Sequence, residues 1–191
     1  MLVEILESLT KKDKPFEYFD THSGTGLYHL HSANAQKLAE HLTGISQLIP
    51  AEWPELSRYL SIIKNHNHGK SVSHYPGSPL IAADFLRAKD KAWLYELHPK
   101  DYELLEKNTP SRKIKTFHSD GLAGVLSLLP PTSRRGLTLI DPSYEVKNEY
   151  RHVYETVSKA YKKFSTGIYA IWYPVVDRST IDTLERQFIR S

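Results

Sequence analysis

The chain alternates short apolar runs with longer segments whose apolar residues recur at helical spacing. Its first 14 residues, MLVEILESLTKKDK, predict an amino-terminal helix. Five later runs end in polar residues and predict strands over 15–24, 91–99, 112–121, 135–144 and 167–176. The segments after the last four runs predict helices over 100–108, 122–130, 148–165 and 178–190.

The order of these elements leads to a fold class. Strands that alternate with helices of about ten residues form right-handed βαβ units and a parallel sheet. We therefore predict a single doubly wound, mostly parallel α/β domain over residues 1–191. A long polar, helix-like segment over about residues 31–74 interrupts the alternation, and we interpret it as a helical insertion after the first strand.

Composition excludes some classes of protein. With 40% hydrophobic and 25% charged residues the chain is typical of a globular domain. No apolar run approaches the roughly 18 to 20 residues of a membrane helix. The absence of cysteine excludes disulfides, thiolate metal sites and a cysteine nucleophile. We expect a cytoplasmic protein that makes no membrane contact.

Charge and histidine content add little by themselves. The net charge of +3 allows an anionic partner without requiring one. Basic clusters at 11–14, 64–70, 133–135 and 159–163 suit a phosphate backbone, but for any one of them a solvated surface is the simpler interpretation. Ten histidines occur, yet no H-E-x-x-H or carboxylate-flanked set is present, and we predict no metal site. Serine-hydrolase elbow and Walker A motifs are also absent.

Polar residues follow four of the predicted strands. In doubly wound sheets ligands bind outside the carboxyl ends of the strands, so these positions are the candidates for a site. They are Asp20, Thr21, His22, Gly24 and Gly26, then Glu96, then Asp120 and Gly121, then Asp141, Pro142, Ser143 and Tyr144. One acid in such a place is commonplace, whereas four in register indicate a site.

Taken singly, three of these strand ends are ambiguous. The glycines of DTHSGTG permit a close backbone approach to a ligand, but a tight turn without a ligand is equally consistent. Glu96 lies roughly where a Rossmann-like fold places an acid that binds ribose hydroxyls, although an isolated acid is more often a surface residue. Asp120 suits an adenine amino group, and a plain turn is the alternative.

The sequence DPSY, residues 141–144, is more specific. It resembles the Asp/Asn-Pro-Pro-aromatic motif of methyltransferases that act on nucleic-acid amino groups. An adenine amine is a poor nucleophile because its lone pair is delocalised into the ring. Hydrogen bonds from the amine to the Asp141 carboxylate and the Pro142 carbonyl would localise that lone pair for attack on a sulfonium methyl. The Tyr144 ring would stack on a base removed from its helix.

One family resembles the chain over nearly its whole length. The bacterial 23S rRNA adenine-N6 methyltransferase J family is similar in KDKPFEYFDTHSGTGLYHL, YPGSPLIA, YELHPKDYELL, PPTSRRGLTLIDPSYEVKNEY and GIYAIWYPVV. The resemblance implies a Rossmann-like class I methyltransferase fold, S-adenosylmethionine as methyl donor, and the exocyclic N6 amine of an adenine in 23S rRNA as acceptor. We expect a monomer that acts on protein-free rRNA or an early assembly intermediate.

The resemblance also implies roles for individual residues. The donor-binding residues are His22 and Ser78 at its methionine end, Glu96 at its ribose, Asp120 and Gly121 at its adenine, and Asp141. Asp141 is also the catalytic acceptor for the target amine, together with Pro142, and Tyr144 packs on the target base. The helical insertion matches the family's helical subdomain and is expected to contact RNA.

Three features depart from the family pattern. Ser143 replaces the usual second proline, which should loosen the loop while leaving the Pro142 carbonyl available. The family begins with an additional segment that carries a Tyr, a His and a Lys-His pair. Its sheet has seven strands, whereas about five are predicted here. We therefore expect a domain truncated at both ends, and the resemblance leaves the activity of these 191 residues alone open.

Two alternatives stay open at this point. A DNA adenine methyltransferase shares the chemistry of DPSY, but no extra target-recognition domain follows the motif. A non-catalytic nucleic-acid-binding relative is favoured by Ser143 and by the missing amino-terminal segment. Binding of S-adenosylmethionine distinguishes an enzyme from the second alternative.

Overall fold

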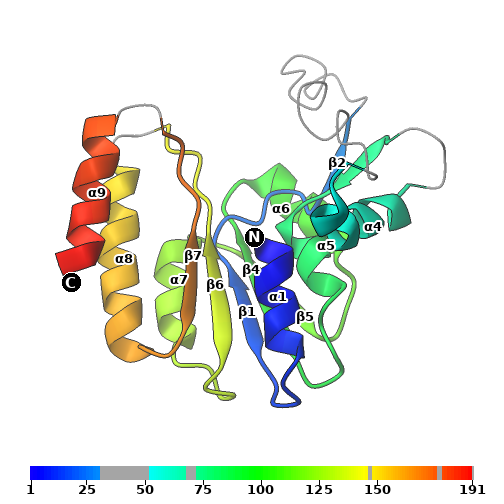
Figure 1. The fold of residues 1–191 in the computed structure, drawn as a ribbon, viewed down its shortest axis with the longest axis horizontal. Coiled ribbons are helices and arrows are strands. Elements are labelled where there is room, and N and C mark those ends of the chain that lie inside the picture. The colour runs from blue at the N-terminus through cyan, green and yellow to red at the C-terminus, as the bar shows by residue number, and fades with distance from the viewer. Residues whose placement is uncertain (31–51, 68–71, 146–147, 176–177, 191) are drawn as a thin grey trace.

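The central element of the fold is a five-stranded parallel sheet (Figure 1). The computed structural model describes residues 1–30, 52–67, 72–145, 148–175 and 178–190. The sheet contains β1 (Glu17–Asp20), β4 (Lys91–Glu96), β5 (Ile114–His118), β6 (Gly136–Ile140) and β7 (Ile168–Ile171), in the order β5-β4-β1-β6-β7. Each neighbouring pair is parallel. The strand order reverses beside β1, so the switch point of the sheet lies at the carboxyl ends of β1 and its neighbours.

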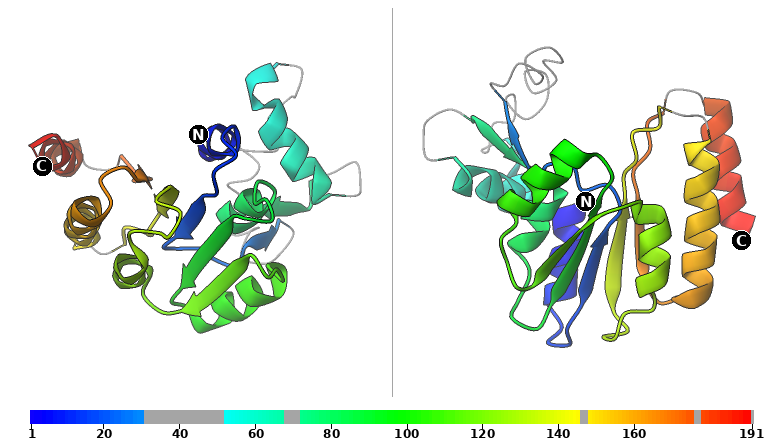
Figure 2. Two further views of the ribbon diagram at one scale, coloured as in Figure 1. Left: turned by 90° about the horizontal axis from the view of Figure 1, so that it is seen from below. Right: turned by 180° about the vertical axis from the view of Figure 1, so that it is seen from behind.

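Helices cover both faces of this sheet (Figure 2). One face carries α1 (Leu2–Thr10), α5 (Ser78–Ala83) and α6 (Pro99–Asn108). The other carries α7 (Gly121–Leu128) and α8 (Glu149–Lys163), and α9 (Arg178–Arg190) packs against α8. The prediction of a doubly wound, mostly parallel α/β fold is confirmed.

Burial on both faces explains why the central strands do not alternate between buried and exposed residues. All four residues of β1 and all five of β6 are buried. Successive side chains of a strand point to opposite faces. Tyr18 therefore packs in the cluster formed with α1 and α5, while Phe19 packs with residues of α7 and α8. A strand covered twice has no polar face, and its sequence shows no alternation.

The five predicted strands of the sheet are confirmed, but each is shorter than predicted. Strand β6 ends at Ile140, before Asp141, and β5 ends at His118, before Asp120. The polar residues at these ends leave the ladder and form the loops and helix starts that border the site. The predicted helices correspond to α1, α6, α7, α8 and α9, whereas the short helix α5 was not predicted.

The structure describes only part of the segment predicted as a helical insertion. Helix α4 (Ser57–Asn65) lies within it, preceded by the 3-10 helix η2 (Pro54–Leu56). Two short strands that were not predicted, β2 (Leu27–His29) and β3 (His74–Pro76), lie at the borders of this segment and pair antiparallel. Three-residue strands are too short for a period of two to be recognised. The rest of the predicted insertion, 31–51 and 68–71, lies outside the described residues.

Candidate active site

The acids predicted at four strand ends lie along one edge of the sheet. Asp20 is the last residue of β1, Glu96 the last residue of β4, and Asp141 follows β6 directly. Asp120 lies two residues beyond β5 and precedes α7. Because these strands are parallel neighbours, their carboxyl ends share the upper edge of the sheet in Figure 1. The two-stranded sheet β2-β3 lies beside this edge (Figure 1).

Asp20 is the most deeply enclosed of these acids, with none of its surface exposed. One carboxylate oxygen accepts a hydrogen bond from the Tyr18 hydroxyl at 2.7 Å, and the other accepts from the His22 backbone N–H at 3.3 Å. Ser78 also hydrogen-bonds to this carboxylate. Burial raises the pKa of Asp20 to about 6, and the nearby Asp141 charge adds to the rise, while the three hydrogen bonds oppose it. The carboxyl therefore titrates close to neutral pH.

His22 lies in the loop after β1, near the acids Glu96 and Asp120. Its Nδ1 is 2.8 Å from the Thr21 hydroxyl, which itself donates to the Leu139 carbonyl of β6. Partial burial lowers the pKa of His22, and the charges of Glu96 and Asp120 oppose that change. Because the Thr21 hydroxyl proton is donated to Leu139, a neutral imidazole would donate from Nδ1 to the Thr21 oxygen, which leaves Nε2 as an acceptor for a ligand.

Glu96 is held in place by the main chain. One carboxylate oxygen accepts from the Gly24 N–H at 2.8 Å, and the other accepts from the His98 N–H at 2.7 Å. Gly24 has φ of +58°, and a Cβ there would meet the Tyr28 hydroxyl at 2.0 Å, so the turn requires glycine. Each oxygen keeps a second lone pair, so the carboxylate is oriented but still able to accept from a ligand.

Asp120 and Gly121 have structural roles of their own. One oxygen of Asp120 accepts from the N–H groups of Leu122 and Ala123, at 2.8 and 3.3 Å, and caps α7. A Cβ on Gly121 would lie 2.1 Å from the Thr21 carbonyl oxygen. Glycine therefore lets the start of α7 touch the loop after β1, and this contact joins two edges of the candidate site.

The loop after β6 presents Asp141 at the surface. The side chain of Asp141 is exposed, Pro142 behind it is buried, and Ser143 is exposed. The surrounding protein nevertheless desolvates the Asp141 carboxylate enough to raise its pKa. A carboxylate of raised pKa is a stronger proton acceptor than an ordinary aspartate.

Tyr144 is the strained residue of this loop. Its φ is +55°, which is rare for a bulky side chain and is found where the surrounding structure imposes it. The ring packs against Tyr150 of α8, with 4.4 Å between ring centroids. Its hydroxyl is buried and has no hydrogen-bond partner among the described residues. Burial raises the pKa of that hydroxyl well above its usual range.

The structure adds two tyrosines that the sequence analysis did not select. Tyr18 was missed although it lies two residues before Asp20, a spacing that places both on the same face of a strand. Tyr28 of β2 was missed because that strand was not predicted. Its ring lies over Gly24 and Gly77. Burial raises the pKa of the Tyr28 hydroxyl, and the charges of Asp20, Asp101 and Glu96 raise it further.

Several of the predicted site residues are close enough for the charge of one to affect the pKa of another. Ser78 hydrogen-bonds to Asp20, and Asp20 feels the charge of Asp141. Burial lowers the pKa of His22, and the charges of Glu96 and Asp120 act in the opposite direction.

Among the described residues, no group of three or more His, Asp or Glu is arranged to hold a metal ion. None of the described helices is long and apolar enough to cross a membrane.

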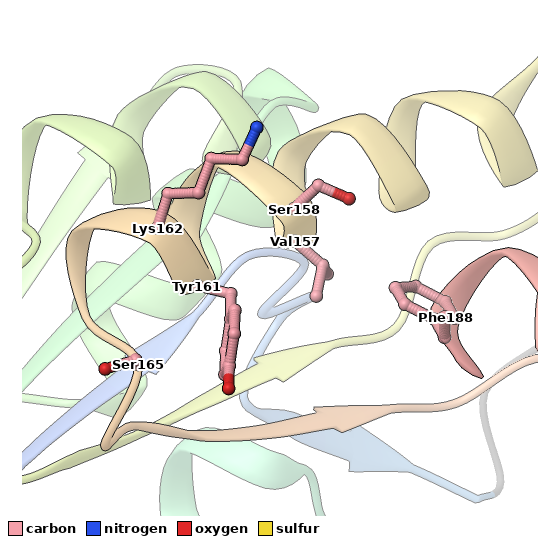
Figure 3. A pocket seen from close by; sticks show the side chains of 6 residues that line it. All are labelled: Val157, Ser158, Tyr161, Lys162, Ser165 and Phe188. Atoms are coloured by element: carbon pink, nitrogen blue, oxygen red, sulfur yellow. The ribbon is translucent and has the colours of Figure 1, made fainter. Parts of the chain in front are cut away.

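A cavity of about 530 Å³ lies elsewhere, between the carboxyl-terminal half of α8 and α9 (Figure 3). It is lined by Val157, Ser158, Tyr161, Lys162, Ser165 and Phe188. No residue of the predicted site lines it. Its walls lack the acids that the strand ends provide, so we do not assign the chemistry to this cavity.

Comparison with known proteins agrees with the resemblance. Residues 13–191 match the family model described as "Ribosomal RNA large subunit methyltransferase D, RlmJ". This chain belongs to that family.

Two relatives share the name "Ribosomal RNA large subunit methyltransferase J". The one from Escherichia coli K12 is 47% identical over 183 residues, which cover 93% of this chain and 64% of the relative. The one from Haemophilus influenzae Rd is 48% identical over 182 residues, which cover 93% of this chain and 65% of the relative. The chain thus spans slightly less than two thirds of the length of these RlmJ relatives.

A solved structure is similar over nearly the whole chain. The crystal structure of a Legionella pneumophila protein, titled with the family name DUF519, superposes with a TM-score of 0.86 at 38% identity. The match covers 99% of this chain and 71% of that protein. This chain therefore shares its Rossmann-like fold with a solved relative.

Proposed function

We propose that this protein transfers a methyl group from S-adenosylmethionine to the exocyclic N6 amine of an adenine in 23S rRNA. The observation that supports this most strongly is the rim of acids at the carboxyl ends of β1, β4, β5 and β6, the last of which is Asp141 of DPSY. Membership of the RlmJ family supports the substrate class.

The residues at this rim fit the proposed donor. When bound, S-adenosylmethionine supplies a methyl group on a positively charged sulfur. Asp20 and Asp141 place negative charge beside each other, and each has a raised pKa, so a neighbouring cation would stabilise their ionised forms. Glu96, oriented by two backbone N–H groups, would accept from ribose hydroxyls. Gly24 and Gly121 let Tyr28 and the Thr21 main chain pack closely against the loops that border the site.

Further residues of the family motif complete this proposal. His22 and Ser78 would line the methionine end of the donor. Asp120 uses one oxygen to cap α7, and its second oxygen would accept from the donor's adenine, next to the backbone of Gly121. No metal enters this scheme, and the chain would act as a cytoplasmic monomer.

Asp141 and its neighbours would activate the acceptor amine. The Asp141 carboxylate and the Pro142 carbonyl accept hydrogen bonds from the two N–H groups, which localises the lone pair of nitrogen. The donor's S–C bond would break as the N–C bond forms, which leaves a neutral thioether. The Asp141 carboxylate, whose raised pKa favours protonation, would take the proton that the amine loses. The Tyr144 ring, held at a positive φ next to Tyr150, would pack on the extruded base.

The test compares Asp141→Asn with Asp84→Asn, which makes the same chemical change at an exposed position outside the strand ends. We expect Asp141→Asn to lower the rate of methyl transfer to protein-free 23S rRNA by roughly 10²–10³-fold while calorimetry still detects donor binding. Asp84→Asn should retain the rate. Equal rates for the two variants would contradict the role of Asp141.

The substrate is tested with the same assay. We expect methyl incorporation into protein-free 23S rRNA or an early assembly intermediate, and none into duplex DNA. Incorporation into DNA alone would overturn the assignment of the substrate. Failure of the full chain to bind S-adenosylmethionine would overturn the enzymatic proposal as a whole.

A further inference from the structure

The amino ends of the central strands carry a concentrated positive charge. Four loops precede β1, β4, β5 and β6, over residues 11–16, 87–90, 109–113 and 130–135, and we call them the basic rim. They contain nine lysines and arginines against two aspartates, a net charge of +7, whereas the whole chain carries +3 and the remainder therefore −4. In Figure 1 the basic rim lies at the lower end of the sheet, opposite the candidate active site.

Hydrogen bonds join these loops into one surface. The Arg87 guanidinium donates to the Lys14 carbonyl at 3.0 Å, and the Arg135 guanidinium donates to the same carbonyl at 2.9 Å. Lys113 donates to the Leu86 carbonyl beside Arg87. Two guanidinium groups that share one acceptor are close together. Burial lowers the pKa of the Arg135 guanidinium, and the nearby Arg87 charge lowers it further, as expected for two cations in proximity.

Both aspartates of the basic rim are engaged in pairs. Asp90 has a fully buried side chain and accepts from Arg87 at 2.7 Å, and Asp13 pairs with Lys89. Neither Arg87 nor Lys89 is therefore an uncompensated charge. Among the described ion pairs none involves the five exposed cations Lys11, Lys12, Lys14, Arg112 and Arg134.

The dimensions of the basic rim fit a polyanion. Neighbouring strands lie about 4.8 Å apart, so four adjacent strand starts extend over about 14 Å. A duplex with the charge density of DNA presents one phosphate charge per about 1.7 Å, or about eight over that length. Exposed like charges repel one another and destabilise the compact state, and an anionic backbone across them would relieve that repulsion.

We propose that the basic rim binds the phosphate backbone of RNA, at a position separate from the adenine that is methylated. This inference rests on the proposed function, because it assigns a second contact to the same RNA. The five residues of β6 separate the two ends of the sheet by about 17 Å. A short single-stranded RNA that reaches the acids would not reach the basic rim, whereas a folded rRNA domain has helices that extend this far.

The experiment removes four exposed charges by Lys12→Gln, Lys14→Gln, Arg112→Gln and Arg134→Gln in the full chain. A control variant removes four exposed charges elsewhere by Lys107→Gln, Lys159→Gln, Lys162→Gln and Arg186→Gln. The net charge changes equally in both. The dissociation constant for a protein-free, folded domain of 23S rRNA is measured between 50 and 200 mM salt, and methyl transfer is measured at saturating RNA.

We expect the basic-rim variant to bind the rRNA domain at least about tenfold more weakly. The slope of log affinity against log salt should become shallower by about 3, because each phosphate contact contributes about 0.7 to 0.9. The turnover number at saturating RNA should stay unchanged, because these residues lie far from Asp141. The control variant should keep the affinity and the slope of the original protein.

Two outcomes overturn the inference. One is an affinity and a salt slope equal to those of the control variant, and the other is equal weakening of a short oligonucleotide that carries only the target adenine. The double variant Lys12→Gln, Lys14→Gln provides a second measurement should the fourfold variant misfold, with about half the change in slope expected. Failure of the proposed function is distinguishable, because the original protein would then bind RNA at the basic rim but transfer no methyl group to it.

Discussion

The buried carboxyl of Asp20 makes the stability of this protein depend on pH in a defined direction. Its side chain is fully buried and hydrogen-bonded to Tyr18 and His22, and burial raises its pKa from the ordinary 3.8 to about 6. Asp20→Asn keeps the shape of the side chain but removes its charge. We predict that the stability of this variant relative to the original protein increases as pH rises.

The magnitude follows from the change in pKa. A rise from 3.8 to about 6 corresponds to about 3 kcal/mol, at about 1.4 kcal/mol for each tenfold change. A raised pKa in the folded state means that the folded protein holds the proton more tightly than the unfolded chain does. Well below pH 3.8, Asp20 is protonated in both states and does not lower the free energy of unfolding. The loss of stability from its buried charge is complete once pH has risen above about 6.

The assay is denaturant unfolding of both proteins at pH 4, 5, 6, 7 and 8. The free energy of unfolding of Asp20→Asn minus that of the original protein should increase by about 2 kcal/mol between pH 4 and pH 7, because part of the total effect has already developed at pH 4. Differences in hydrogen bonding that do not depend on pH cancel in this comparison. Asp84→Asn is the control, because it makes the same chemical change at a solvent-exposed position. A difference for Asp20→Asn that stays constant over the pH range would refute the reasoning.

Two further predictions concern the strand-end loops. Gly121→Ala should destabilise the fold by about 1–3 kcal/mol and weaken donor binding, because its Cβ would lie 2.1 Å from the Thr21 carbonyl oxygen; an unchanged denaturation midpoint and donor affinity would contradict this. Tyr144→Phe should stabilise the ligand-free protein by about 1–2 kcal/mol, since it removes a buried hydroxyl that lacks a partner among the described residues. A lowered midpoint in thermal unfolding would instead mean that this hydroxyl does have a partner.

The candidate site was largely predictable because it follows from strand order. Once alternating strands and helices predicted a parallel sheet, the polar residues after each strand had to lie at one edge. This placed Asp20, Glu96, Asp120 and Asp141 together without any knowledge of distances. The same reasoning explains why strand ends were predicted too long, since the acids mark the point where the chain leaves the sheet.

Residues outside that reasoning were missed, or were placed only by resemblance. Ser78 hydrogen-bonds to Asp20, but it lies on α5, a six-residue helix far along the chain from β1. Tyr28 lies on a three-residue strand that is defined only by its partner β3. Neither position has a local periodicity long enough to be recognised, so only the folded chain brings them to the site.

The basic rim is likewise visible only in part from the sequence. The clusters at 11–14 and 133–135 are visible in the sequence, and each by itself is an ordinary solvated surface. Only the parallel sheet brings four loops together at one end, where Arg87 and Arg135 share the Lys14 carbonyl.

Local patterning was therefore sufficient for the strands of the central sheet, for the longer helices around it, for the fold class and for the edge of the sheet where the acids lie. It was sufficient because helix and strand periods, and the alternation of the two, are properties of neighbouring residues. Which carboxylate is buried, which oxygen is already engaged and which charges accumulate were decided by tertiary structure alone. Burial, pKa and charge density depend on contacts between residues far apart in the chain, and no local pattern records those contacts.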